Sequence, residues 1–399
     1  MSTTLTTFAL ALVLAAGASA QSVFVVAPVA GPGVFATDIQ PAVDAAANGD
    51  LVLVKAGAYS GFSVDGKGVS VVADAGAAVA CNGLVFVNHI AAGQRVLLQG
   101  LSVHGDNISP AIITLDSPGP IWIESCTVQG GTGNGPGLVA VSVNSCPSVV
   151  IQRSTMTGGN GLVGGTGNNM GAPALHTANS AVAVGDSQCI GGNGAPPSTV
   201  VGGPGGPGLR VLSGFVFATG TTFQGGTGAP PVPPLFPGGP GGPGINTQAA
   251  VTTLQCTLVG GSGNPSGAPT VLLGTGSAAT LPGVAGHFSI TSPVREGQAT
   301  TITAGGVPGE SELLLFSLSP SPVKLLVKDA GALVLAGGGQ FALGTIPASG
   351  TLSTPIVAPD LPAAVQSLIV WCQPIFFDSP LTHAVIGPAS ELVILDAGL

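Results

Sequence analysis

The sequence VVIQRSTMTGG, at residues 149–159, returns in outline as VAVGDSQCIGG at residues 182–192. Four further segments share this form and end in a Gly or a Gly-Gly pair: residues 96–105, 121–131, 216–226 and 251–261. The segments recur every 25 to 35 residues, and periods of this size are typical of solenoid or array proteins. The chain is therefore expected to fold as stacked copies of one unit.

Apolar residues in each segment alternate with a period of two, which indicates β-strands. The position nine residues before the first Gly is β-branched in all six copies, as at Val182. The alternation breaks at pairs such as Gln152-Arg153 and Gly185-Asp186, where we expect a corner between two short strands. The apolar residues two positions before the Gly should stack from coil to coil: Val103, Val128, Met156, Cys189, Phe223 and Leu258.

A third strand is expected before each segment, because a proline-led apolar motif stands there. Proline is tolerated at the start of a strand but not inside its ladder, so it marks where the strand begins. The motifs begin at Pro110, Pro136, Pro173, Pro207 and Pro243. Three strands, a corner and a Gly turn make one coil of a parallel β-helix, with coils about 4.8 Å apart.

The loops between each Gly pair and the next proline contain Gly-Gly-Pro triplets, as in residues 202–208 and 238–244. Because they recur at one position of the coil, they should lie side by side along one flank. Insertions on one face of a solenoid often form its binding face. Low-complexity spacers are the alternative interpretation.

The composition argues against some classes of function. Of 399 residues, 65 are Gly and 34 are Pro, yet 45% are apolar, which favours a packed repetitive fold over disorder. Only 8 residues are Lys or Arg and the net charge is −9, so no nucleic-acid partner is expected. Charged residues make up 6% of the chain, and acid, base and metal chemistry all draw on them.

The chain divides into three expected parts. Residues 1–20 have the pattern of a signal peptide, because an apolar run ends at a small-x-small motif before Gln21. A membrane anchor is the alternative, but the run is shorter than the roughly 20 residues that span a bilayer. Residues 21–282 are expected to form the β-helix. Residues 283–399 lose the Gly period, and their short apolar strands favour a small antiparallel β-sandwich.

These features predict a secreted or cell-surface, extracytoplasmic protein without a membrane span in the mature chain. Such a compartment permits disulfides, and the pairing of six cysteines cannot be decided from the sequence. None of them forms a C-x-x-C pair, so no zinc site is indicated. Cys189 lies in the inward column and is expected to be a buried thiol.

The first third of the chain carries a family likeness. Residues 37–46 have the N-cap and apolar spacing of a short helix that stops near residues 48–49, and a strand at residues 51–54 and a Gly-x-Tyr turn at residues 57–59 follow. This resembles the opening of secreted right-handed parallel β-helix proteins of the pectin-lyase-like superfamily, in which an amphipathic helix covers the first coil. The likeness extends over about residues 23–280. It implies an all-β, right-handed solenoid with an N-terminal capping helix.

The C-terminal region is similar to β-domains that follow repeat regions in secreted bacterial proteins. That resemblance implies a role in packing or in retention at the surface. The alternative is that this domain covers the open end of the solenoid, which would otherwise expose a sheet edge.

Enzymes of the superfamily use carboxylates that converge on a cation, or close sets of Asp residues, and the sequence contains neither arrangement. The best constellation for a catalytic site is Arg153 beside Asp186 in one corner column, with Glu124 one coil earlier. The alternative interpretation is a solvated ion pair, which contributes little to stability. No metal site and no cofactor are expected.

A candidate ligand site lies three residues after each opening proline. This column is expected to point outward and contains Ile113, Val139, His176, Arg210 and Asn246. His176, Arg210 and Asn246 would form a polar strip that hydrogen-bonds a sugar chain; three unrelated surface residues are the alternative. A second outward column would suit an ice or crystal surface, although Gln188 interrupts it; it contains Thr127, Thr155, Thr222 and Thr257.

The leading hypothesis is an exported, non-catalytic β-solenoid with a structural or binding role at the cell surface. Its partner would be an extracellular polysaccharide or another cell-surface component. The rival hypothesis is a polysaccharide lyase or glycoside hydrolase with a divergent active site.

Overall fold

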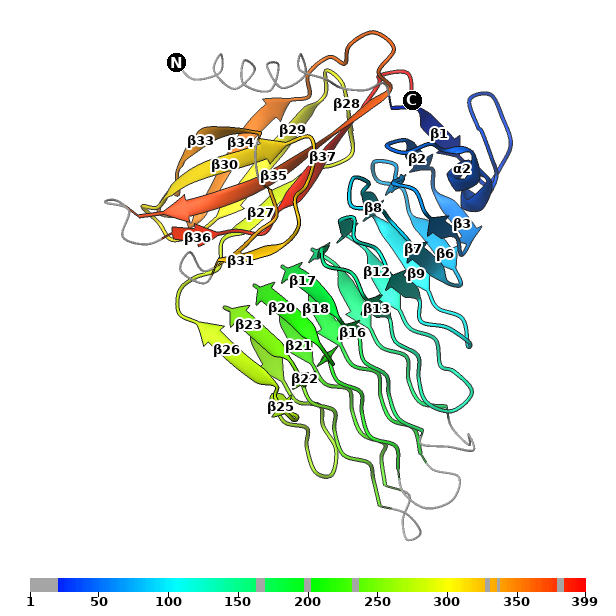
Figure 1. Ribbon diagram of the computed structural model, residues 1–399, viewed down its shortest axis with the longest axis vertical. Helices are drawn as coiled ribbons and strands as arrows, with labels where there is room; N and C mark the ends of the chain where they lie inside the picture. The colour runs from blue at the N-terminus through cyan, green and yellow to red at the C-terminus, as the bar shows by residue number, and fades with distance from the viewer. Residues whose placement is uncertain are drawn as a thin grey trace.

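The structure is a computed structural model that describes residues 21–162, 169–196, 202–231, 237–326, 331–335, 338–378 and 384–399. The expected signal peptide, residues 1–20, lies outside the described residues. The described chain forms a right-handed parallel β-helix followed by mainly antiparallel sheets, which confirms the fold class (Figure 1). Among the described residues, no helix combines the length and the apolar character needed to cross a bilayer.

The solenoid is built from three parallel sheets. Sheet I contains, in spatial order, β1 (Val23–Val26), β2 (Leu51–Val54), β5 (Ser70–Ala73), β8 (Val96–Gln99), β11 (Ile121–Glu124), β14 (Val149–Gln152), β17 (Ser180–Gly185), β20 (Gly214–Thr219), β23 (Ala250–Leu254) and β26 (Ser277–Leu281). Sheet II contains β3 (Gly57–Ser60), β6 (Val79–Asn82), β9 (Leu101–His104), β12 (Thr127–Gln129), β15 (Thr155–Thr157), β18 (Gln188–Ile190), β21 (Thr222–Gln224) and β24 (Thr257–Val259). Sheet III contains β4 (Ser63–Asp65), β7 (Val85–Asn88), β10 (Ile112–Leu115), β13 (Val141–Asn144), β16 (Leu175–Ala178), β19 (Leu209–Val211), β22 (Ile245–Thr247) and β25 (Thr270–Leu272).

The inward column of sheet II has the expected register. Val128 pairs with Met156, Met156 with Cys189, and Cys189 with Phe223. All four side chains are buried in one core cluster. Cys189 is a buried free thiol, as predicted, and the other five cysteines are also unpaired.

The corners between sheets I and II lie where the alternation breaks. Ser125, Arg153 and Asp186 have φ angles of 53°, 46° and 46°, so one residue in the left-handed region turns each of these coils. The next residue closes each corner with a side-chain bond to the carbonyl two positions back: Ser154 Oγ donates to Gln152 O at 2.8 Å, Ser187 Oγ donates to Gly185 O, and the thiol of Cys126 donates to Glu124 O. This geometry places the side chains of the corner residues at the boundary of sheet I.

One predicted strand is displaced along the chain. We expected a strand from Leu138 with Val139 pointing outward, but β13 begins at Val141, which pairs with Ile112. Ser142 therefore takes the outward position beside His176. Leu138 instead donates its N–H to Gly131 O, because it belongs to the stack of arms beside sheets II and III that is described next.

The Gly-Gly pairs that we predicted as turns are extended chain. None of the glycines in the five pairs, all of them in the described part of the chain, has a positive φ. From each pair the chain continues sheet II outward as an arm and then returns to sheet III, and the arms lie side by side (Figure 1). We call this stack the glycine extension. Its described residues are 130–140, 158–162, 169–174, 191–196, 202–208, 225–231, 237–244 and 260–269.

Hydrogen bonds in the glycine extension repeat every three residues. Gly205 N donates to Pro240 O in the next coil, Gly206 N donates to Gly192 O in a facing arm, and Pro207 has no N–H. Three residues per turn is the period of a polyproline II helix. The third position lies outside the stack, so proline fits there without the loss of a hydrogen bond. This accounts for the Gly-Gly-Pro triplets.

Backbone hydrogen bonds cross the glycine extension as a continuous hydrogen-bond chain. The N–H of each residue in this series donates to the carbonyl of the residue named before it. The chain contains Gly131, Leu138, Gly159, Ala172, Gly192, Gly206, Gly226, Gly242, Gly261 and Gly267. A Cβ atom at Gly226 would collide with Gly192 O, and the other glycines of this chain meet similar obstacles. Glycine is thus required because neighbouring backbones approach each other directly.

Helix α2 (Ile39–Ala45) covers the first coil, as expected. Asp38 is its N-cap, and the carboxylate accepts a 2.8 Å hydrogen bond from Ile39 N. Ile39 and Val43 are buried in the core of the solenoid. The N-terminal end of the core is therefore closed by an amphipathic helix.

The C-terminal region forms the expected β-sandwich. Sheet IV contains β27 (His287–Ile290), β29 (Ala299–Gly305) and β34 (Thr351–Val357). Sheet V contains β28 (Val294–Arg295), β37 (Ser390–Leu395), β35 (Ser367–Phe377), β30 (Ser311–Ser317) and β33 (Gly339–Thr345), with β36 (Ala384–Ile386) on β35. β31 (Lys324–Leu326) pairs with β32 (Gly331–Leu333). Every pair is antiparallel except β28 with β37.

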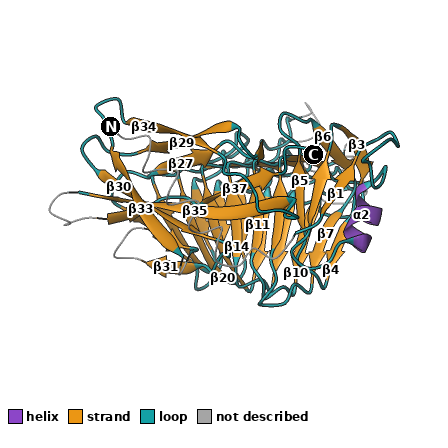
Figure 2. Ribbon diagram, turned by 90° about the horizontal axis from the view of Figure 1, so that it is seen from above, coloured by secondary structure: helices purple, strands orange, loops and turns teal. Residues whose placement is uncertain are grey.

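The sandwich lies along the outer face of sheet I instead of covering only the open end of the solenoid. The rings of Trp122 on β11 and Trp371 on β35 are 4.4 Å apart between centroids. Figure 2 shows β35 and β37 crossing the solenoid strands. One hydrophobic cluster joins outward residues of sheet I, such as Leu97 and Phe217, to the sandwich.

Candidate functional site

Sheet III presents the polar strip that the sequence predicted. His176 pairs with Arg210 and Arg210 with Asn246, so the three side chains occupy consecutive coils at one position. Arg210 is exposed, and His176 and Asn246 are partly exposed. Burial and the nearby Arg210 charge both lower the pKa of His176, so its imidazole is neutral at pH 7. From His176 to Asn246 the strip spans two coil spacings of about 4.8 Å each, and Ser142, one coil before His176, is buried.

A row of prolines runs beside this strip. Pro173, Pro207 and Pro243 each stand three residues before a member of the strip, and all three are partly exposed. The row belongs to the returning arms of the glycine extension, where the third position of each triplet points away from the stack. An apolar row of prolines therefore runs parallel to the hydrogen-bonding groups of the strip on sheet III.

The outward column of sheet II carries no charge. Thr127 pairs with Thr155, Gln188 follows, and Thr222 and Thr257 complete the predicted column. A second polar ladder continues on the outgoing arms, where Asn193 N donates to Asn160 Oδ1 and Thr227 N donates to Asn193 Oδ1. These amides are thus occupied by contacts within the protein.

The candidate catalytic residues lie at the boundary between sheet I and the sandwich. Arg153 pairs with Glu124, which is fully buried and also accepts a 2.8 Å bond from Ser390. Arg153 also donates to Ser390 Oγ and, at 3.0 Å, to Phe288 O. Burial lowers the pKa of Arg153 to about 10, and the nearby Asp186 opposes this shift. The Arg153–Glu124 pair thus lies within the solenoid, and both residues also bond to the sandwich, whereas the ion pair that Asp186 forms is with His287 and not with Arg153.

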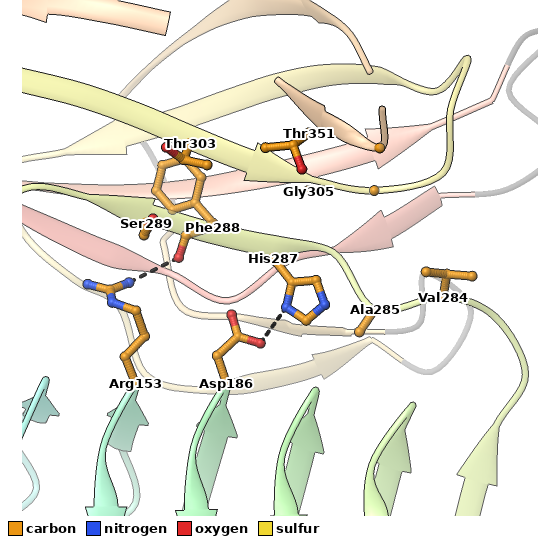
Figure 3. A pocket seen from close by; sticks show the side chains of 12 residues that line it. Arg153, Asp186, Val284, Ala285, His287, Phe288, Ser289, Thr303, Gly305 and Thr351 are labelled. Atoms are coloured by element: carbon orange, nitrogen blue, oxygen red, sulfur yellow. Dashed lines mark hydrogen bonds and ion pairs between the residues drawn. The ribbon is translucent and has the colours of Figure 1, made fainter. Parts of the chain in front are cut away.

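Asp186 has a different partner. His287 Nδ1 lies 2.7 Å from Asp186 Oδ1, and the hydrogen bond and charge of Asp186 raise the pKa of His287 (Figure 3). The two residues line a cavity of about 400 Å³ between the corner of the solenoid and sheet IV. Arg153 also lines this cavity, so the structure brings two of the three candidate catalytic residues to one space.

Sequence reasoning missed His287 at this site. It follows the last repeat, and 101 residues separate it from Asp186, so no periodic pattern connects them. Within the described residues, no group of three or more His, Cys, Asp or Glu side chains is placed to hold a metal ion.

Neither protein-family models nor curated proteins show a match to this chain.

Proposed function

We propose that the protein is an exported, non-catalytic β-solenoid that binds polysaccharide at the cell surface through sheet III. The observation that carries this proposal is the strip of His176, Arg210 and Asn246 in consecutive coils, beside the row of prolines. Sugar chains have polar edges and apolar ring faces. The strip would hydrogen-bond the polar edges, and the row of prolines would contact the apolar ring faces. The resemblance to the pectin-lyase-like superfamily and the signal-peptide pattern support export.

Glycan-array binding of the chain from Gln21 tests this proposal, followed by affinity measurement for the strongest glycan. Arg210→Ala should weaken binding at least tenfold, because arginine is enriched among the residues that dominate binding energy once an interface has formed over them. Asn246→Ala should weaken it less, since it removes only neutral hydrogen bonds. Salt should have a modest effect, because the strip carries one fixed charge.

Gln188→Ala is the matched control, because it removes a polar side chain of the same kind from sheet II. It should leave the affinity unchanged. If Gln188→Ala abolished binding and Arg210→Ala did not, the binding site would be on sheet II and not on sheet III. Absence of binding to every polysaccharide of the array would contradict the proposal.

The rival function, a lyase or glycoside hydrolase, is favoured by one contact. Asp186 holds His287 Nδ1, which leaves Nε2 free to accept a proton. Glu124 has no exposed surface, so the chemistry would rest on Asp186, His287 and Arg153. Release of unsaturated or reducing ends from acidic polysaccharides, abolished in Asp186→Asn, would establish this function in place of the first.

A further inference from the structure

The wall of the cavity between the solenoid and the sandwich carries polar atoms that have no hydrogen-bond partner among the described residues. Asp186 Oδ1 accepts from His287 Nδ1, and neither Asp186 Oδ2 nor His287 Nε2 has a hydrogen-bond partner among the described residues. Ser289, Thr303 and Thr351, which carry hydroxyls, also line this cavity (Figure 3). Its volume of about 400 Å³ lies in the range of small-molecule sites.

The charges around this cavity favour a neutral ligand. Arg153 is already paired with Glu124, and His287 is already paired with Asp186. The free oxygen of Asp186 would repel an anion, and the Arg153 guanidinium at the wall would repel a cation. An ionic ligand would thus meet a like charge as well as an opposite one, and each opposite charge is already in an ion pair, so neither sign of ligand charge is favoured.

The free atoms also disfavour an apolar ligand. An apolar group would remove water from the Asp186 carboxylate and the hydroxyls without replacing its hydrogen bonds, which is unfavourable for each hydroxyl and more so for the charged carboxylate. A polyhydroxylated ligand satisfies a carboxylate acceptor, an imidazole nitrogen and hydroxyls together, because each of its hydroxyls both donates and accepts.

The geometry points to a binding site for a single neutral sugar in this cavity, with Asp186 Oδ2 and His287 Nε2 as its main hydrogen-bonding atoms. The site is separate from sheet III, and it uses residues of both domains. A sugar bound there contacts the corner of the solenoid and sheet IV at the same time.

Ligand titration followed by NMR tests this site, with glucose, galactose, mannose and N-acetylglucosamine as probes and galacturonate as the anionic comparison. At least one neutral sugar should shift the imidazole Cε1–H signal of His287, which is the signal absent from His287→Gln. Asp186→Asn should weaken the binding at least tenfold. Thr351→Val, which replaces an exposed hydroxyl at the wall, should weaken it less and leave the fold intact.

The chain provides a matched control. His89 Nδ1 lies 2.9 Å from Asp65 Oδ1 in an exposed pair outside this cavity, so Asp65→Asn should not affect sugar binding. Arg210→Ala should not affect it either, which separates this site from the proposed polysaccharide site. The inference is overturned if no neutral sugar shifts the His287 signal, if galacturonate binds more tightly, or if Asp186→Asn and Asp65→Asn behave alike.

Discussion

Two flanks of the solenoid are covered in different ways. On sheet I the outward side chains are large and varied, as at Leu97, Trp122 and Phe217, and a second domain buries them. In the glycine extension, arms of neighbouring coils bury each other through backbone hydrogen bonds. Both flanks are closely packed, but the packing of sheet I depends on side-chain volume and that of the glycine extension depends on the absence of side chains.

The two kinds of packing should tolerate substitutions to different extents. Packed side chains of sheet I have neighbours that relax, so exchanges that conserve volume should cost little. The arms of the glycine extension have only carbonyl oxygens opposite each Cα, and these are held by a continuous chain of bonds. Addition of one carbon atom is therefore a severe change there.

Replacement of Trp122 by Ala tests the side-chain flank and should have the largest effect. It removes the contact with Trp371 and leaves a cavity between the domains, at a cost of about 4 kcal/mol. Thermal unfolding should separate into two transitions, and limited proteolysis should cut between the solenoid and the sandwich. Ile121→Ala is the control, since this side chain points into the solenoid core and its loss should not release the sandwich. Retention of a single transition in Trp122→Ala would show that the domains do not depend on this contact.

Gly226→Ala tests the backbone flank. The new Cβ atom would collide with Gly192 O, and separation of the two arms should cost about 2–3 kcal/mol of unfolding free energy. Gly135→Ala is the matched control, because a Cβ atom at this position of the same extension meets no atom within 4 Å. Equal urea-unfolding midpoints for the two variants would contradict the role assigned to close backbone approach.

pH should act on the side-chain flank alone, because the described residues of the glycine extension include no Asp, Glu, Lys, Arg or His. The pKa of His287 is raised by Asp186, so this pair stabilises the protein fully below about 6.5, the usual pKa of histidine. The stabilisation is lost as the pH rises through the raised pKa. Its size should be below about 1 kcal/mol, because the imidazole is 54% exposed.

The measurement is the difference in melting temperature between wild type and His287→Gln across this pH range. Burial raises the pKa of Glu312 to about 7, so it titrates in the same range, but it does so in both proteins and cancels in the difference. A difference that grows as the pH rises would contradict the predicted sign.

The core of the solenoid was predictable because apolar and polar side chains alternate along a strand that has one buried face. Val128, Met156, Cys189 and Phe223 are apolar at one phase, and the corner at Arg153 interrupts that phase. The covering of sheet I also left a signal. Residues 121–123, Ile-Trp-Ile, are apolar at both phases, which is typical of a strand that is buried on both faces.

The glycine extension was harder to predict, because glycine has no side chain whose alternation reveals a direction. Its signal is the period of three in Gly-Gly-Pro, which we interpreted as loop and turn. The pairing of Asp186 with His287 had no signal of this kind, since it depends on how a non-repetitive domain lies against the solenoid.

The triplet geometry makes the width of the molecule adjustable independently of its length. A Gly-Gly-Xaa insertion in an outgoing arm, matched by Gly-Gly-Pro in the returning arm, would lengthen both by about 9 Å, one turn at about 3.1 Å per residue. The coil itself would keep its register. Span and coil number are thus separate variables in this architecture, and the protein could broaden towards one end without redesign of its core.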